Sequence, residues 1–205
     1  AVRFIADITD GDVYRVVREV NPSLVLHLAA LASNERANTA PVEAMQVNAV
    51  GTARLLSACR DLPVAPWFVL ASSSEVYGYS TGPVIETDPI KAKNPYAASK
   101  IAAEGAVRAS GLDFTIMRPF NTYGRALINL PKFVADEAIV QAITMGGVWL
   151  RNASPKRDFL FRDDHVGAYL RVVERIEAQA LSSGQTFNFG TGQVYSIGEM
   201  ASLVS

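Results

Sequence analysis

The octapeptide KNPYAASK, residues 93–100, places a tyrosine and a lysine four positions apart, Tyr96 and Lys100. Its small residues and Pro95 predict the first turns of a helix, and residues four apart share one helical face. An ammonium beside a phenol favours the phenolate and lowers the phenol pKa from an ordinary value of about 10. Such a phenol can exchange protons near neutral pH, as general acid–base catalysis requires. The start of an ordinary surface helix would look the same, so the pair needs support from the rest of the chain.

The elements around this pair alternate between strands and helices. Three short runs are apolar without polar alternation, as strands buried on both faces are; they cover residues 23–30, 66–74 and 113–120. A helix is predicted over 41–60, and a loop over 78–92 precedes the Tyr96 helix. Because parallel strands need crossover helices between them, this alternation predicts an α/β fold with a doubly wound parallel sheet.

From about residue 131 onward, the chain is predicted to contain both helices and short strands. The expected elements are a helix around 131–145, a short strand over GVWLRN (147–152), a helix from about 163 to 178, the segment QTFNFGTG (185–192) and a final helix start over 196–205.

Polar side chains follow two of the predicted strands. Ser72, Ser73, Ser74 and Glu75 follow one, and Asn121 follows the next. In open α/β sheets, ligands bind at the carboxyl ends of the strands. A serine at position 73 can share a substrate oxygen with Tyr96: the tyrosine removes a hydroxyl proton, the serine orients the oxygen, and a nicotinamide accepts the hydride. The alternative is a polar exit from a strand into a loop.

Composition narrows the classes of partner. The chain has 205 residues, with 19 basic and 20 acidic side chains, so its charge does not indicate a nucleic-acid partner. The lone Cys59 cannot form an internal disulfide and lies in an apolar helical segment, which favours a reducing compartment. The sequence has no apolar run of membrane-spanning length and no signal-peptide layout at its start. We therefore expect a cytoplasmic protein without membrane partners, and we assign no metal ligands.

Six motifs occur along the chain in a fixed order: HLAA, NAVGT, SSSEVYG, PYAASK, RPFNTYG and RDFLFRDDHV. Together they resemble the extended short-chain dehydrogenases/reductases, the nucleotide-sugar epimerase/dehydratase family. The resemblance implies NAD or NADP in a Rossmann-like domain and a nucleotide sugar under a smaller C-terminal lobe. We expect the cofactor-binding core over residues 1–125, and elements of the partly represented substrate lobe over 126–205.

The resemblance also implies roles for individual residues. The catalytic matches are Ser73, Glu75, Tyr96 and Lys100. The cofactor-site matches are Asp7, Ile8, Leu28, Ala29, Ala30, Asn48, Ser72, Tyr96, Lys100 and Pro119. The substrate-site matches are Ser74, Asn121 and Arg157. Arg157 can bracket a diphosphate or form a surface ion pair with Asp158 or Asp163. His27 lies inside a strand and is predicted to be structural.

One family feature is missing from this sequence. The family's Gly-x-x-Gly-x-x-Gly turn, whose amides meet the cofactor pyrophosphate at a helix N-terminus, does not occur. The opening residues AVRFIADITD resemble the family's third strand instead. We therefore expect the first βαβ unit to be missing, and a chain without it to bind cofactor poorly.

Glu75 is the residue that best distinguishes between the possible reactions of the family. A 4,6-dehydratase oxidises carbon 4, removes the carbon 5 proton and expels the carbon 6 hydroxyl, so it needs an acid–base group beyond the tyrosine. Family dehydratases place a glutamate at this position, which favours 4,6-dehydration of an NDP-hexose through a 4-keto intermediate. The alternatives are 4-epimerisation, decarboxylation or reduction, or a non-catalytic or truncated relative that acts as a binding module, with Glu75 bracing the loop that begins at Val76.

The resemblance further implies a homodimer. Family members pair the Tyr96-type helix and the helix before it, here 41–60. Val42, Ala102 and Val107 are the expected apolar residues on the available faces.

Overall fold

The chain divides into two compact units. The computed structural model describes residues 3–80, 82–124 and 133–204. Unit 1 comprises residues 1–118 and 178–188, and unit 2 comprises residues 119–177 and 189–205. The functional division expected between residues 125 and 126 stays a prediction.

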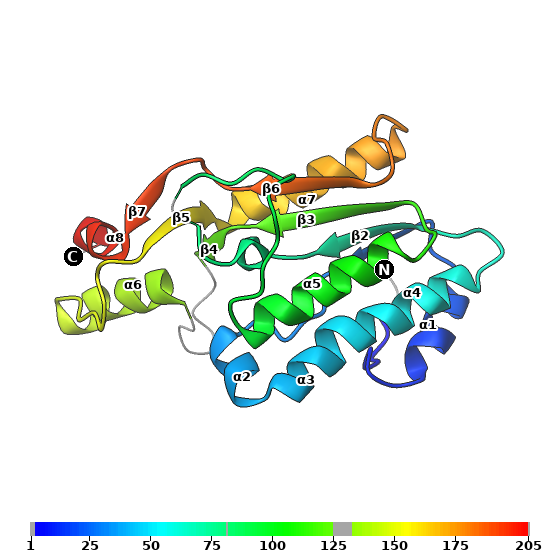
Figure 1. Ribbon diagram of the computed structural model, residues 1–205, viewed down its shortest axis with the longest axis horizontal. Coiled ribbons are helices and arrows are strands. Elements are labelled where there is room, and N and C mark those ends of the chain that lie inside the picture. Colours follow the sequence, from blue (N-terminus) through cyan, green and yellow to red (C-terminus); the bar gives the residue numbers. More distant parts are fainter. Residues whose placement is uncertain (1–2, 81, 125–132, 205) are drawn as a thin grey trace. The chain divides into compact units, whose positions relative to one another are not determined.

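Unit 1 is built on a sheet in the order β1-β2-β3-β6 (Figure 1). The strands are β1 (Leu24–His27), β2 (Trp67–Ala71), β3 (Phe114–Pro119) and β6 (Gln185–Phe189). β1 pairs with β2 in parallel, with Leu26 opposite Val69, and β2 pairs with β3 in parallel, with Val69 opposite Thr115. Helical crossovers join both pairs, as parallel neighbours require. The predicted α/β class, a Rossmann-like parallel sheet with flanking helices, is confirmed.

The helical segments of unit 1 lie between these strands. They are α1 (Asp12–Val20), α2 (Asn34–Thr39), α3 (Pro41–Met45), the π-helical η1 (Gln46–Gly51), α4 (Thr52–Arg60), the 3₁₀ turn η2 (Ser74–Tyr77) and α5 (Pro95–Arg108). The helix predicted over 41–60 is confirmed as the succession α3, η1 and α4. The sequence analysis did not predict α1 and α2, which are only 9 and 6 residues long.

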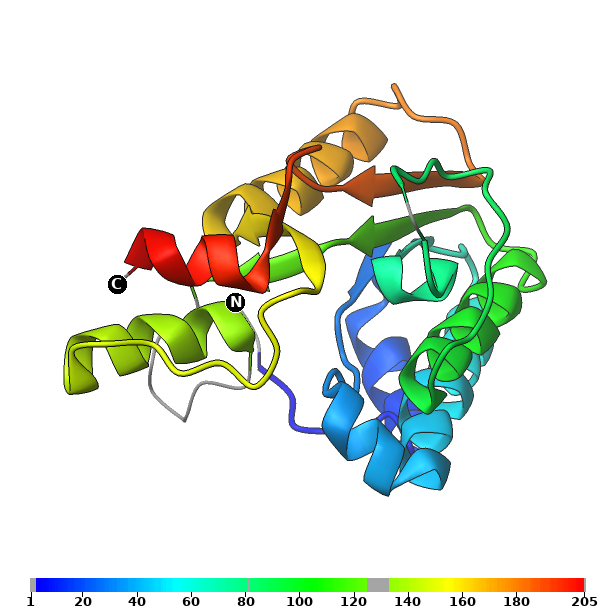
Figure 2. The ribbon, with the colours of Figure 1, turned by 60° about the vertical axis from the view of Figure 1, so that its left-hand side comes forward.

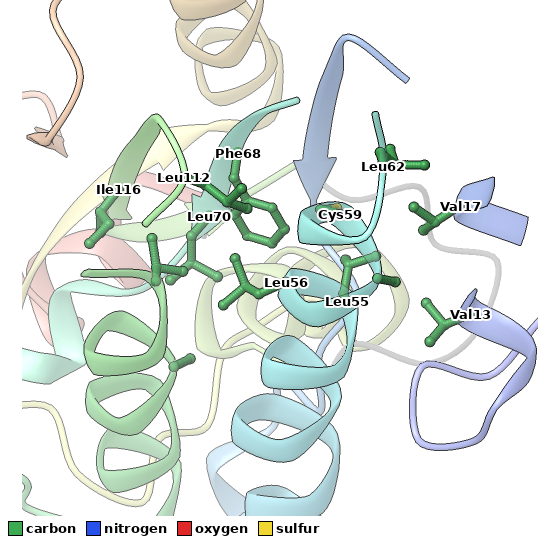
Figure 3. Close-up of a cluster of buried hydrophobic side chains, with 13 residues drawn as sticks. Val13, Val17, Leu55, Leu56, Cys59, Leu62, Phe68, Leu70, Leu112 and Ile116 are labelled. Carbon is green, nitrogen blue, oxygen red and sulfur yellow. The ribbon is translucent and has the colours of Figure 1, made fainter. Parts of the chain in front are cut away.

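The core of unit 1 forms where α1, α4 and α5 pack on one face of the sheet (Figure 3). Phe68 and Leu70 on β2 and Ile116 on β3 meet Leu56 on α4, since alternate strand residues point to one face. Val107 is fully buried in this core. The prediction that Val107 lies on an outer face of α5 is therefore wrong, because this side of the helix turns toward the sheet.

Unit 2 contains a smaller sheet in the order β4-β5-β7. Its elements are β4 (Asn121–Tyr123), α6 (Val134–Met145), β5 (Lys156–Phe161), α7 (Arg162–Glu177), β7 (Val194–Ser196) and α8 (Ile197–Val204). β4 is parallel to β5, and β5 is antiparallel to β7. Figure 2 shows α6 beside α8, where Ala138 and Met200 share one apolar cluster. The first two positions of the helix predicted at 131–145 lie outside the described residues.

Two predicted strands are absent from their expected places. Residues 147–152 form no strand, and the strand of this region is β5 instead. Val148 and Leu150 pack against the cluster of α6 and α8, so their apolar character serves loop packing. Residues 3–7 also form no strand, since their backbone pairs with no strand in the described ranges. Within those ranges, every helix is too short or too polar to cross a bilayer.

Candidate active site

Helix α5 carries Tyr96 and Lys100 on one face, as predicted. Asn94 caps the helix because its side-chain oxygen accepts the backbone N–H of Ala97 at 2.7 Å, and Pro95 occupies the first turn. The Tyr96 ring is buried at 8% exposure, and Lys100 Nζ lies 6.0 Å from the ring centroid. The helix therefore holds the Lys100 ammonium over the face of the Tyr96 ring.

Lys100 is a buried cation anchored on the sheet. Its Nζ donates to the backbone oxygen of Ala71, the last residue of β2, at 2.8 Å. Burial lowers the pKa of Lys100 to about 8, and the Glu104 carboxylate one turn further along α5 opposes part of that effect. Among the described residues Lys100 makes this one hydrogen bond, and an ammonium has three donors. Lys100 can thus donate to a ligand while it keeps its hold on β2.

Glu104 is a second anchor between α5 and the sheet. Its Oε1 accepts the Ser72 hydroxyl at 2.6 Å. Arg118, near the end of β3, donates to both carboxylate oxygens, at 2.9 and 2.7 Å. The ends of β2 and β3 are therefore tied to α5, and the predicted cofactor residue Ser72 uses its hydroxyl in this frame. Sequence reasoning missed Glu104, although its spacing of four from Lys100 is the signal that could have found it.

Ser73 and Glu75 form the turn that follows β2. Ser73 Oγ accepts the backbone N–H of Glu75 at 3.2 Å and so caps η2, whose first residue is the half-buried Ser74. Glu75 Oε2 lies 3.0 Å from Lys93 Nζ and accepts the Asn94 side-chain amide at 3.4 Å. Glu75 is consequently connected both to Ser73 and to the beginning of the Tyr96 helix. Sequence reasoning did not identify Lys93 or Asn94.

Asn48 on η1 braces helix α5, and His27 on β1 bonds to the start of α4. The Asn48 side chain accepts the Leu31 backbone N–H at 2.8 Å and donates to Ser99 Oγ on α5, also at 2.8 Å. His27 Nε2 lies 2.9 Å from Thr52 Oγ1, whose single proton goes to the Asn48 backbone oxygen, so His27 must donate. Burial, with the charge of Lys100, lowers the pKa of His27 to about 4. His27 is buried and satisfied, as predicted, and Asn48 acts here through backbone support.

The Asp7–Ile8 turn lies on the π-helical segment. The Asp7 carboxylate is exposed and accepts the Thr9 backbone N–H at 2.8 Å and its hydroxyl at 2.7 Å, and these bonds lower the pKa of Asp7. A Cβ on Gly51 would come within 2.8 Å of the end of the Ile8 side chain, so Ile8 packs closely on this glycine. The segment Leu28–Ala30 after β1 is likewise exposed or half-buried. These positions are open to a ligand.

Three predicted ligand residues lie in unit 2. Pro119 ends β3, and Asn121 begins β4. Arg157 in β5 is half-buried and donates to the Lys156 backbone oxygen at 2.7 Å. Asp158 instead accepts from Thr191 and Gly192, and Asp163 pairs with Arg162. Within the described part of the chain, the ion pair considered for Arg157 is not formed.

The parallel sheet and the Ser73, Tyr96 and Lys100 set on one helix–sheet frame define the class of short-chain dehydrogenases/reductases. The sequence model of the NAD dependent epimerase/dehydratase family matches residues 3–197. The chain belongs to this family.

Relatives in the family catalyse different reactions. A UDP-glucose 4-epimerase from Mycolicibacterium smegmatis is 31% identical over 98% of this chain and 64% of its own length. A dTDP-glucose 4,6-dehydratase from Xanthomonas campestris pv. campestris is 34% identical over 90% of this chain and 55% of its own. The structure of RMD from Pseudomonas aeruginosa, complexed with NADPH, superposes with a TM-score of 0.86 at 28% identity, covering 99% of this chain and 70% of that one. The chain thus spans less than two thirds of the length of both curated relatives.

The side chains present suit the family's dinucleotide. Lys100 offers ammonium donors, and the exposed Asp7 offers a carboxylate acceptor; each suits ribose hydroxyl groups, of which a dinucleotide has two sets. Lys100 and Asp7 would hold the cofactor through these groups, with the exposed segment Leu28–Ala30 as an apolar surface for it.

Proposed function

We propose that the protein modifies nucleotide sugars with NAD or NADP as cofactor, and that its reaction is 4,6-dehydration of an NDP-hexose through a 4-keto intermediate. Family membership supports the first part. The second part rests on one observation: the Glu75 carboxylate is bonded to the N-terminal end of the Tyr96 helix, two residues after Ser73. A carboxylate there provides the second acid–base group that dehydration needs and simple oxidation and reduction do not.

Tyr96, Ser73 and Lys100 handle the proton of the carbon 4 hydroxyl. When bound, the nicotinamide accepts a hydride from the sugar and later returns it. Tyr96, as the phenolate, takes up the hydroxyl proton, and the Lys100 ammonium over its ring balances the phenolate charge before the transfer. Ser73 Oγ already accepts the Glu75 N–H, so its own proton is available to donate to the substrate oxygen.

Glu75 acts on the neighbouring carbons. A carbonyl at carbon 4 acidifies the carbon 5 proton, which the carboxylate removes. The same proton then passes from Glu75 to the carbon 6 hydroxyl, directly or through a water, and this group leaves as water. Oε2 of Glu75 is held by Lys93 and Asn94, while no hydrogen bond to Oε1 is present among the described residues. Oε1 is the atom that we assign to the proton transfer.

The remaining ligand assignments extend this proposal. Asp7, Ile8, Leu28–Ala30 and Pro119 are assigned to the cofactor. Ser74 is assigned to the sugar, while Asn121 and Arg157 are assigned to the substrate diphosphate, where a guanidinium can make two parallel hydrogen bonds. Asn48 and Ser72 support the cofactor site through the backbone segments that they hold.

The test is Glu75→Gln in the full-length protein, supplied with GDP-, UDP- and dTDP-hexoses in deuterium oxide. Glu19→Gln, on the surface of α1, is the matched control. We expect the Glu75 variant to reduce its bound cofactor yet neither incorporate deuterium at carbon 5 nor release a 4-keto-6-deoxy sugar. A parent enzyme that inverts carbon 4 without exchange at carbon 5 would overturn the dehydration proposal.

A 4-epimerase is the second candidate, and one contact favours it. The Glu75–Lys93 pair also fits a bracing role for Glu75, because it ties η2 to the start of α5. Epimerisation needs no base at carbon 5. In that case Glu75→Gln would change turnover no more than Glu19→Gln does.

A binding module without catalysis would hold no nicotinamide, so the purified full-length protein would lack the ultraviolet absorbance that bound NAD adds.

We also propose a homodimer formed by α3, α4 and α5. Val42 on α3 is 72% exposed and Ala102 on α5 is half-buried, so both can contribute to such an interface. Sedimentation equilibrium of the full-length protein is expected to give twice the monomer mass. A monomer at high concentration would reject the dimer.

A further inference from the structure

Glu75 and Lys93 form a mostly buried ion pair beside the proposed catalytic residues. Lys93 Nζ lies 3.0 Å from Glu75 Oε2, and both side chains are mostly buried, at 17% and 16% exposure. An ion pair at this depth is screened less by water and salt than a surface pair is. The pair joins the turn after β2 to the residue three positions before Tyr96.

Two further contacts restrict the position of this pair. Asn94 donates to the same Glu75 oxygen at 3.4 Å while its own oxygen caps α5 at the Ala97 amide. Lys93 Nζ also lies 5.5 Å from the ring centroid of the exposed Tyr79, within the range of a cation–π contact. One carboxylate oxygen is therefore fixed by a cation and an amide, and the cation is itself held.

We infer that Lys93 is a positioning residue that orients the Glu75 carboxylate toward the sugar, an inference that rests on the proposed dehydration. A glutamate side chain has three rotatable bonds, and holding one oxygen restricts the directions in which the other can point. The ammonium and the Asn94 amide fix Oε2, which leaves Oε1 to accept the carbon 5 proton. Tyr96 is fixed separately, by α5 and by its packing with Leu31 and Ala44. Lys93 thus serves the step at carbon 5 and leaves the proton transfer at carbon 4 to Tyr96.

The experiment compares Lys93→Met, Lys93→Arg and Lys91→Met in the full-length protein with its NDP-hexose in deuterium oxide. Lys91 is exposed, and it contacts Val76 through its backbone, so Lys91→Met is a matched control. Two rates are measured. The first is reduction of the bound cofactor by hydride from carbon 4 of the sugar, followed by absorbance. The second is incorporation of deuterium at carbon 5 of the sugar, followed by mass spectrometry. Unfolding midpoints identify any variant that fails to fold.

We expect Lys93→Met to slow carbon 5 exchange by about 10-fold or more, the usual effect of losing a hydrogen bond to a charged group. Reduction of the cofactor should stay within about 2-fold of the parent, since Tyr96 and Lys100 are untouched. Lys93→Arg should restore most of the exchange because it keeps the charge, and Lys91→Met should match the parent.

Three results would overturn the inference. Unchanged exchange in Lys93→Met, when Glu75→Gln abolishes it, removes the role of Lys93 and leaves the proposed dehydration standing. An equal loss of both rates makes the pair a general brace of the site. A parent that turns over at carbon 4 without carbon 5 exchange removes the dehydration proposal, and the role of Lys93 with it.

Discussion

Helix α5 organises two ion pairs that differ in burial. At its middle, Glu104 and Arg118 meet at 2.7 Å with side chains 0% and 3% exposed. At its start, Glu75 and Lys93 meet at 3.0 Å and keep about one sixth of their surface in contact with solvent. The inner pair is fully enclosed and also binds Ser72, so it fixes the architecture. In the outer pair, Oε1 of Glu75 remains available for the proposed proton transfer. Burial thus separates the charges that build this site from the charge that we expect to work in it.

Tyr96→Phe should give the largest effect, because it removes a proton carrier and leaves the frame of α5 intact. We expect turnover of a nucleotide sugar to fall by ~10³-fold, within the usual range for a lost general acid–base. The unfolding midpoint should stay close to that of the parent. Tyr14→Phe is the matched control, because Tyr14 on α1 is a partly buried tyrosine; it should keep full activity. Turnover of Tyr96→Phe within about threefold of the parent would refute its role.

Glu104→Gln breaks the inner pair and should mainly affect stability. It leaves the Arg118 guanidinium buried without a counter-charge, which costs about 3 to 5 kcal/mol of unfolding free energy. Glu19→Gln removes one partner of an exposed pair with Arg15 and should cost no more than ~1 kcal/mol. Urea unfolding followed by circular dichroism measures both. Equal midpoints for the two variants would contradict the distinction between the buried and exposed pairs.

Lys100 should make stability depend on alkaline pH. Burial lowers its pKa to about 8, whereas the unfolded chain keeps the ordinary value of 10.5. Between these values the unfolded state holds the extra proton, so the unfolding free energy rises with pH across this window. The contribution is on the order of 3 kcal/mol. The difference in unfolding free energy between the parent and Lys100→Met, measured from pH 7 to 10.5, should show this rise. A difference that is flat or falls with pH would contradict it.

The sequence allowed the parallel sheet to be predicted, because the residues at 24–27, 67–71 and 114–119 are mostly apolar without the regular polar alternation of a half-exposed strand. The smaller sheet could not be predicted in this way. β5 reads KRDFLF, with alternating burial, and it exists because β4 and β7 pair with it. The apolar run at 147–152 was the stronger signal, yet those side chains pack as a loop.

The residues of the candidate site also fall into two groups, those that could be predicted from the sequence and those that could not. Tyr96 and Lys100 could be found because helical spacing alone places them together. Glu104 shares that spacing, but its partners Ser72 and Arg118 come from two different strands. Lys93 was missed because its contact with Glu75 spans 18 positions and depends on the path of the loop between them. Local periodicity therefore predicts which residues face one another along a helix, and only the fold shows which charges they meet.

The most direct test of the account is a crystal structure of the full-length protein with its nucleotide hexose bound. We expect Tyr96 Oη and Ser73 Oγ both to lie ~3 Å from the oxygen on carbon 4. Oε1 of Glu75 should face carbons 5 and 6, with Oε2 still held by Lys93. A structure in which Tyr96 and Ser73 contact different oxygens, or in which the Glu75 carboxylate points away from the sugar, would contradict the central claim.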